Sequence, residues 1–277
     1  DDLLKPGDKY SFEIPANYSG ANDSTNGAIK FAFRENDFEG IVVTSKGSSN
    51  ELNRKADDKY IDDYESDSKG LYTKIIKKVG DNTEFGITFE NYQKESESST
   101  KPENLTGSYI SAVNEADSER TRVSIDFDYA SSEDSTFDLI KGSLYFNEMD
   151  YENSYKERTL SDGTDNDHDL EQDTYGVNLQ VSNELMVGKA RNLFSYGLEA
   201  SKFNGMRTAR DYAPNSEGIY ELKSGYPQKT VPETDVSKYG IYLQNEYSLG
   251  DLEIIGGIRY DYYNLDSIKD DDWLREG

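Results

Sequence analysis

Apolar and polar residues alternate over long stretches of this 277-residue chain, and that alternation constrains the fold more than any other feature. In residues 122–129, for example, Val, Ile, Phe and Tyr take the odd positions, and Arg, Ser and Asp take the even ones. A period of two residues sends successive side chains to opposite faces of a β-strand, whereas a helix needs a period near 3.6. No segment shows a helical period, so the sequence predicts an all-β protein.

Eleven strands are predicted, most of them about ten residues long: 8–18, 26–35, 38–45, 70–79, 83–93, 121–130, 137–149, 173–183, 192–203, 237–248 and 251–264. Strands of soluble sheets usually have five or six residues, whereas about ten alternating residues match the tilted span of a strand across a bilayer. We therefore expect an antiparallel transmembrane β-barrel.

The predicted connections alternate between short and long. Short connections lie at 35–37, 80–82, 131–136, 187–191 and 249–250, and long polar loops are predicted at 46–69, 94–120, 150–172 and 204–236. The first connection, near 19–25, falls where the alternation calls for a long loop but is shorter than the other long loops. Tight turns at one end of the hairpins and long loops at the other are typical of outer-membrane barrels. Tyrosines recur near the strand ends, where an aromatic girdle would meet the head groups, although tyrosine is also a good strand former anywhere.

Composition excludes several kinds of protein. The 55 acidic residues against 30 basic ones give a net charge of −25, which argues against nucleic-acid binding. The absence of cysteine excludes disulfides and thiolate sites, and a single histidine excludes a His-rich metal site. No catalytic motif is present, so we expect a binding and transport protein and not an enzyme. Charged residues on the polar side of the strands, among them Glu246, Arg259 and Asp261, are predicted to face a wet or plugged lumen.

Several short motifs resemble the TonB-dependent outer-membrane receptors, in particular the haem and haemoglobin receptor branch. They are DLLKPG at 2–7, GLYTK at 70–74, FGITFENY at 85–92, RTRVS at 120–124, PETD at 232–235, YGIYLQNE at 239–246 and GIRYD at 257–261. The resemblance covers the whole chain in order. Barrels of this family have 22 strands, so the resemblance implies that residues 1–277, with eleven predicted strands, are the N-terminal half of the barrel, without the plug domain and the C-terminal half. The last two motifs are common to many TonB-dependent receptors, whereas the first is similar to the segment joining plug and barrel in the haem branch.

The resemblance implies a Gram-negative outer-membrane location, a plug domain outside this chain, and energy supplied through that plug by the TonB–ExbB–ExbD complex. It implies haem, or iron from a haem protein, as the transported ligand, with no permanently bound cofactor. Outer-membrane lipid and lipopolysaccharide would surround the barrel. The lumen-facing Glu246, Arg259 and Asp261 would contact the plug. The motifs that carry the family's haem-contacting histidines, Phe-Arg-Ala-Pro and Asn-Pro-Asn-Leu, do not occur here.

The predicted loop 150–172 contains the remaining candidate residues. His168, Tyr151 and Tyr155 are candidates for contact with the ligand, because neutral imidazole is a good ligand for haem iron. The alternative for His168 is a solvated loop histidine. Asp165, Asp167 and Asp169 resemble the opening of a calcium loop, but Leu170 stands where glycine should follow and position twelve is Gly176. An EF-hand is therefore excluded, which leaves a loose divalent-cation site or a hydrated acidic loop.

Three other functions fit parts of the sequence. The same barrel could carry a ferric siderophore or another nutrient. A passive porin or structural barrel would have no TonB coupling. A secreted all-β binding module would be soluble without detergent, but it has no reason to place its long loops at one end of the strands.

Overall fold

The computed structural model describes residues 4–5, 7–50, 63–100, 109–131, 137–159 and 163–268, and within them it contains strands and no helix. Among these residues there is accordingly no helix long and apolar enough to cross a membrane. The strands are β1 (Tyr10–Glu13), β2 (Ala16–Ser19), β3 (Ser24–Glu35), β4 (Phe38–Asn50), β5 (Asp63–Val79), β6 (Thr83–Thr100), β7 (Tyr109–Ala130), β8 (Leu139–Thr159), β9 (Gly163–Val187), β10 (Ala190–Pro214), β11 (Tyr220–Leu222), β12 (Gln228–Leu249) and β13 (Leu252–Ile268).

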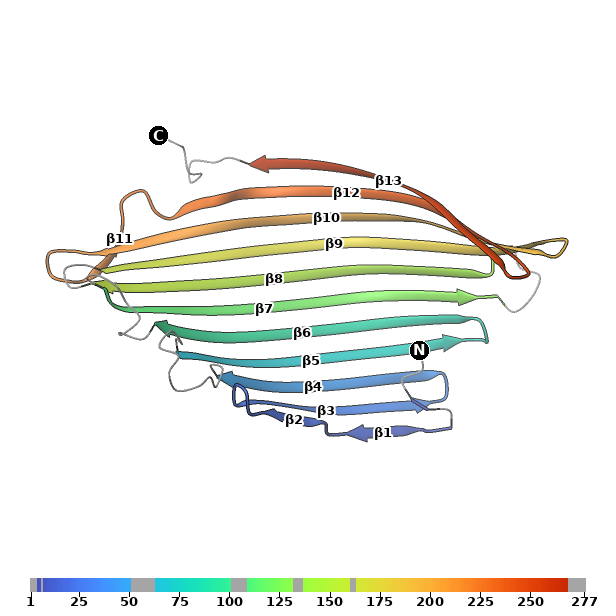
Figure 1. Cartoon of the computed structure of the whole chain (residues 1–277), viewed down its shortest axis with the longest axis horizontal. Helices are drawn as coiled ribbons and strands as arrows, with labels where there is room; N and C mark the ends of the chain where they lie inside the picture. Colours follow the sequence, from blue (N-terminus) through green and yellow to red (C-terminus); the bar gives the residue numbers. More distant parts are fainter. Residues whose placement is uncertain are drawn as a thin grey trace.

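All strands join one antiparallel sheet in chain order, from β1 at one edge to β13 at the other (Figure 1). The predicted all-β antiparallel fold is confirmed. Eleven strands lie on the main path of the sheet, and they correspond to the eleven predicted ones. The predicted strand 8–18 is divided into β1 and β2 around Ile14 and Pro15, because proline has no N–H to donate to a ladder. The short β11 pairs only with β10 and was not predicted.

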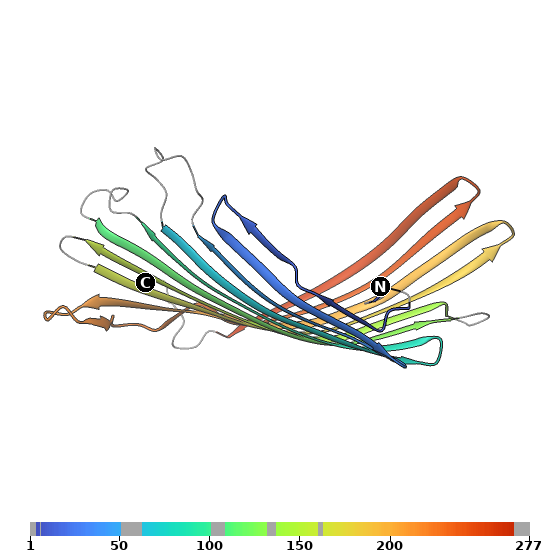
Figure 2. The ribbon, with the colours of Figure 1, turned by 90° about the horizontal axis from the view of Figure 1, so that it is seen from below.

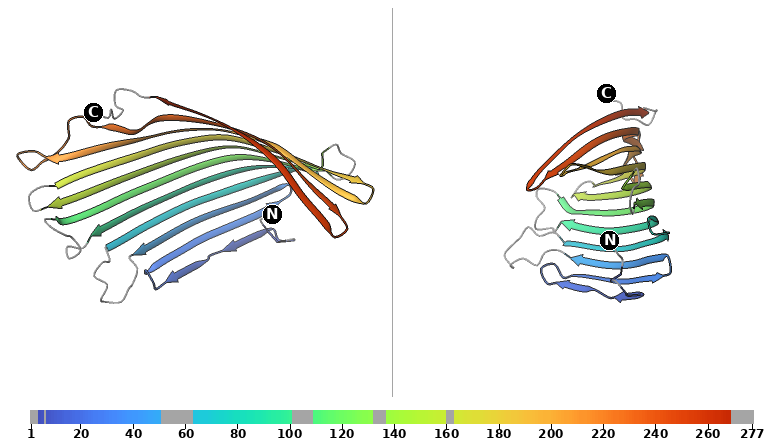
Figure 3. Two further views of the ribbon diagram at one scale, coloured as in Figure 1. Left: turned by 45° about the horizontal axis from the view of Figure 1, so that its top comes forward. Right: turned by 90° about the vertical axis from the view of Figure 1, so that its right-hand side faces the viewer.

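In the part of the chain that the structure describes, the sheet is a single curved and twisted layer, with no second layer against either face (Figures 2 and 3). Within the described segments only five apolar residues are buried, four of them alanines, and no large side chain is fully buried. A sandwich would bury the inner faces of two sheets as a common core. Neither face of the sheet has such a core among the described residues, so they do not form a packed sandwich and each face needs another environment.

The short turns lie where the sequence predicts them. Asn36 in the turn between β3 and β4 has a φ of 52°, and Gly80 in the turn between β5 and β6 has a φ of 65°. Tight hairpins need this left-handed backbone, which glycine and asparagine adopt most readily. These turns and those between β9 and β10 and between β12 and β13 lie at one end of the sheet (Figure 1).

The prediction of long loops at the other end is wrong for most of their length, because the strands continue through them. β8 runs to Thr159 and β9 begins at Gly163, with unbroken pairing from Glu148–Asp173 to Arg158–Gly163. A strand of 25 residues such as β9 extends about 80 Å, whereas the hydrocarbon core of a bilayer is about 30 Å thick. The strands therefore have a membrane-length part near the short turns and an extension beyond it.

Candidate functional site

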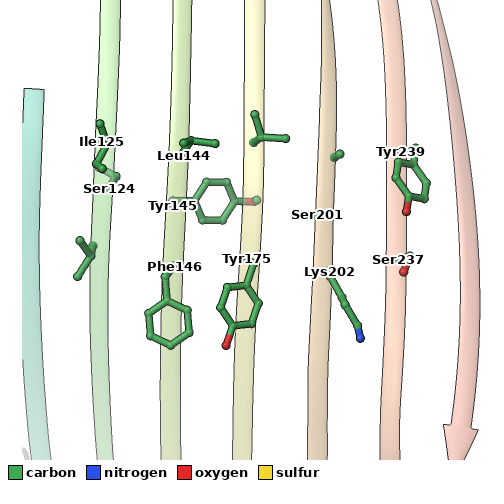
Figure 4. Close-up of a pocket in the computed structure, with 14 residues that line it drawn as sticks. Ser124, Ile125, Leu144, Tyr145, Phe146, Tyr175, Ser201, Lys202, Ser237 and Tyr239 are labelled. Carbon is green, nitrogen blue, oxygen red and sulfur yellow. The ribbon is translucent and has the colours of Figure 1, made fainter. Parts of the chain in front are cut away.

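One face of the membrane-length part is apolar and open to its surroundings. Ile125, Leu144 and Ile258 are 50%, 56% and 72% exposed. Similar side chains on β7, β8, β9, β10 and β12 line a shallow hollow of about 550 Å³, which Figure 4 shows with Ile125, Leu144, Tyr175 and Tyr239 projecting from neighbouring strands. Soluble monomers do not expose an apolar surface that spans a whole sheet, whereas lipid tails cover such a surface. We call this side of the sheet the outer face.

The opposite side, which we call the inner face, carries ion pairs at the same level. Arg259 Nη2 on β13 donates to Glu199 Oε2 on β10 at 2.7 Å and to Asp261 Oδ1 at 2.8 Å. Lys238 Nζ on β12 lies 3.3 Å from Glu199 Oε1. The structure thus brings the predicted lumen residues Arg259 and Asp261 together. Glu246 is outside this cluster and accepts a hydrogen bond from Gln244 at 3.0 Å.

Lys238 is a member of this cluster that sequence reasoning missed. It occupies the same alternating set of positions on β12 as Glu246, so the alternation places it on the inner face. What the alternation does not give is the register, which sets Lys238 opposite Ser201 on β10 and Tyr263 on β13. That register brings its ammonium group within reach of Glu199.

The three predicted ligand-contacting residues lie together on the inner face of the strand extensions. Tyr151 and Tyr155 flank Asn153 on β8, and His168 on β9 is the register partner of Asn153. Tyr155 donates a hydrogen bond to Glu157 at 3.0 Å, and Asn153 donates one to Asn114 on β7 at 2.9 Å. His168 Nδ1 is shielded from solvent and has no hydrogen-bond partner among the described residues. The predicted loop residues therefore form part of a β-sheet wall.

Asp165, Asp167 and Asp169 alternate with that set along β9 and lie on the outer face, about 7 Å apart along the strand. Arg158 pairs with Asp165, and Arg210 pairs with Asp169 through a very short contact. No group of three potential metal ligands gathers within the described part of the chain. The cation site stays a prediction and has no part in the function proposed below.

The outer face of the extensions is crowded with carboxylates, and two neighbours on it have shifted pKa values. Burial, followed by the nearby Glu119 and Asp173, raises the pKa of Asp150 above its usual value. Glu119 is the register partner of Asp150 on β7, and hydrogen bonds from the amides of Gln93 and Asn91 lower its pKa. The pKa values of these two neighbouring carboxylates are thus shifted in opposite directions, because Glu119 has hydrogen-bond donors that stabilise its charge.

A single sheet with an apolar outer face and an ion-paired inner face is the wall of a membrane-spanning β-barrel. The chain belongs to the family described as TonB dependent receptor-like, beta-barrel, whose sequence model matches residues 57–274. This confirms the resemblance at the level of the receptor family and implies an outer-membrane location.

The chain also has the fold of part of a solved structure, the outer membrane transporter YddB from Escherichia coli. The TM-score is 0.59 at 13% sequence identity, and the match covers 87% of this chain and 34% of that one. The chain therefore spans about a third of the length of that transporter. No curated protein matches the chain.

Proposed function

We propose that this chain is part of the barrel wall of a TonB-dependent receptor that takes up haem, or iron from a haem protein, across the outer membrane of a Gram-negative bacterium. The observation that supports haem is the inner-face arrangement of Tyr151, Tyr155 and His168. Aromatic side chains provide area against a flat macrocycle, and a neutral imidazole nitrogen is a ligand for its iron. His168 is the only histidine of the chain.

The same proposal includes a source of energy for uptake. A plug domain outside this chain would close the lumen and receive energy from the TonB–ExbB–ExbD complex. The lumen-facing Arg259, Asp261 and Glu246 would contact that plug through ion pairs and hydrogen bonds. Replacing Arg259 with alanine in the full-length receptor should lower uptake, and unchanged uptake together with unchanged barrel stability would remove this role.

Growth on haem as the only iron source tests the ligand. A strain lacking the gene should fail to grow on haem, and the native gene should restore growth. His168→Ala should restore it poorly, whereas Asn166→Ala, one position along the same face of β9, should restore it fully. In the purified receptor, His168→Ala should also change the Soret band of bound haem, because the axial ligand is lost. Growth on haem without the gene, together with loss of growth on a ferric siderophore, would instead identify a siderophore receptor.

A further inference from the structure

Charge is sorted between the two faces of the strand extensions. One row of register partners crosses four strands on the outer face and is acidic throughout: Glu95, Asp117, Glu152 and Asp169. Beside it lies a second outer row with Glu119, Asp150 and Glu171 on three consecutive strands. Carboxylates so close together repel one another, so this face costs stability at neutral pH.

The inner row between these two outer rows has no acidic residue. It runs from Lys94 on β6 through Ser118, Tyr151 and Leu170 to Arg207 on β10, with a cation at each end. The inner rows on either side of it also lack acidic residues, and one of them contains Arg120. One residue in five of the chain is acidic, so these fifteen inner positions would carry about three carboxylates if charge were not sorted.

Two of the three cations of this inner block, Lys94 and Arg207, are available to a ligand. Within the described part of the chain, no carboxylate forms an ion pair with Lys94 or Arg207. Arg120 is paired with Glu90 on β6 at 3.0 Å, and Lys94 lies beside the Tyr64 hydroxyl. The Cα atoms of Lys94 and Arg207 are four strand spacings apart, about 19 Å, with Ser118, Tyr151 and Leu170 between them. A flat, partly apolar body with oxyanion groups at its periphery fits this surface.

We propose that the inner block of β6–β10 is an anion-binding surface, in which Lys94 and Arg207 bind oxyanion groups of the ligand and Tyr151 contacts its body. The proposal rests on the proposed function in one respect, that the ligand enters through the barrel interior. The acidic outer rows then repel an anionic ligand from the outer face. An anion is therefore attracted to the inner block and not to the outer face of these strands.

The charge of the inner wall can be measured without any ligand, because the chain has no cysteine. Ser118→Cys places a thiol in the centre of the inner block, and Thr208→Cys places one on the outer face opposite Asp169. Both would be made in the full-length receptor in outer-membrane vesicles, with any cysteine outside residues 1–277 replaced by serine. Each would be reacted with an anionic methanethiosulfonate, the sulfonatoethyl reagent, and with a cationic one, the trimethylammonioethyl reagent.

The ratio of anionic to cationic reaction rates should be about tenfold higher at Ser118→Cys than at Thr208→Cys at low ionic strength. Adding Lys94→Gln and Arg207→Gln should lower the ratio at the inner thiol, whereas the outer-face change Glu119→Gln, which removes a negative charge, should not lower it. Equal ratios at the two thiols would overturn the proposal. The comparison of the two thiols stands even if the double variant fails to fold.

Binding is tested with haem, with its dimethyl ester, in which the carboxylates are uncharged, and with ferric citrate. Loss of Lys94 and Arg207 should weaken binding of haem by tenfold or more and leave the ester unaffected. If ferric citrate binds in a way that depends on the two cations, and haem does not bind, the anion-binding surface is supported and the haem receptor is refuted. Equal binding of haem and its ester would support the haem receptor and overturn this proposal. The proposal would also be overturned if no anion were found whose binding depends on the two cations.

Discussion

Replacing Glu39 with alanine is expected to destabilise the sheet more than the loss of an exposed ion-pair carboxylate, because Glu39 is buried between two cations. The residue is only 3% exposed and lies on β4 beside a short turn. Arg34 binds both of its carboxylate oxygens, through Nε at 2.9 Å and Nη2 at 3.2 Å. Lys78 Nζ on β5 lies 2.8 Å from Oε1.

The magnitude follows from how far each partner is removed from water. Exposed ion pairs contribute about 0.2–1 kcal/mol, whereas removing one partner of a fully buried pair costs about 3–5 kcal/mol. The Arg34 and Lys78 side chains are 25% and 38% exposed, and Lys78 keeps a second partner, Glu84, at 3.6 Å. Glu39→Ala should therefore lower the free energy of unfolding by about 2 kcal/mol, between those two limits.

Urea unfolding in detergent micelles, followed by far-ultraviolet circular dichroism, measures this free energy. Glu35→Ala in the same hairpin is the matched control, since Glu35 and its partner Lys9 are 52% and 71% exposed and their charged atoms are 4.0 Å apart. The control should change the free energy of unfolding by less than about 0.5 kcal/mol. Equal losses for the two variants would refute the reasoning that burial makes the Glu39 interactions strong.

Three further predictions concern the two faces of the sheet. Ile125→Arg places a charge among lipid tails and should cost about 2–4 kcal/mol of unfolding free energy in lipid vesicles, whereas Asp126→Arg on the inner face should cost less. Gly176→Val should lower the yield of folded protein on refolding, because a Cβ there would overlap an aromatic ring of β8; Gly142→Ala, whose Cβ would meet only ordinary 3.8 Å contacts, should refold normally. Asp150 has a raised pKa in the folded state, so protonation favours folding and stability from this site should increase as pH falls through that pKa. Asp150→Asn should raise stability at pH 7 and flatten the pH dependence of stability around the pKa of Asp150; a lower stability at pH 7 would contradict the repulsion described above.

The membrane-length strands could be predicted because lipid requires an apolar residue at every second position. In residues 122–129 the alternation is one of hydropathy, which is easily recognised. In residues 148–153 the alternation continues, but Glu148, Asp150 and Glu152 now occupy the outward positions. Because acidic residues disfavour strands in general, the sequence predicts a loop for this segment. An alternation of acidic and uncharged residues was the signal that could have revealed the extensions.

The site could be predicted only in part, because partners across a sheet depend on register. The sequence shows that Arg259 and Glu199 share a face, but not that pairing through β12 brings them to 2.7 Å. His168 was assigned to a loop, and its place beside Tyr151 and Tyr155 depends on the length of the β8–β9 hairpin. A shift of that hairpin by one residue would reverse the faces, and the sequence alone does not exclude it.

Within the described residues, each long strand of this wall is bonded to its neighbours on the main path of the sheet, with only the short β2 and β11 added beside β3 and β10, and no packed common interior ties distant strands together. A copied hairpin inserted at any short turn would therefore interrupt one ladder and leave the others intact. The bore of such a barrel can widen in steps of two strands during evolution without the coordinated substitutions that a packed globule would demand.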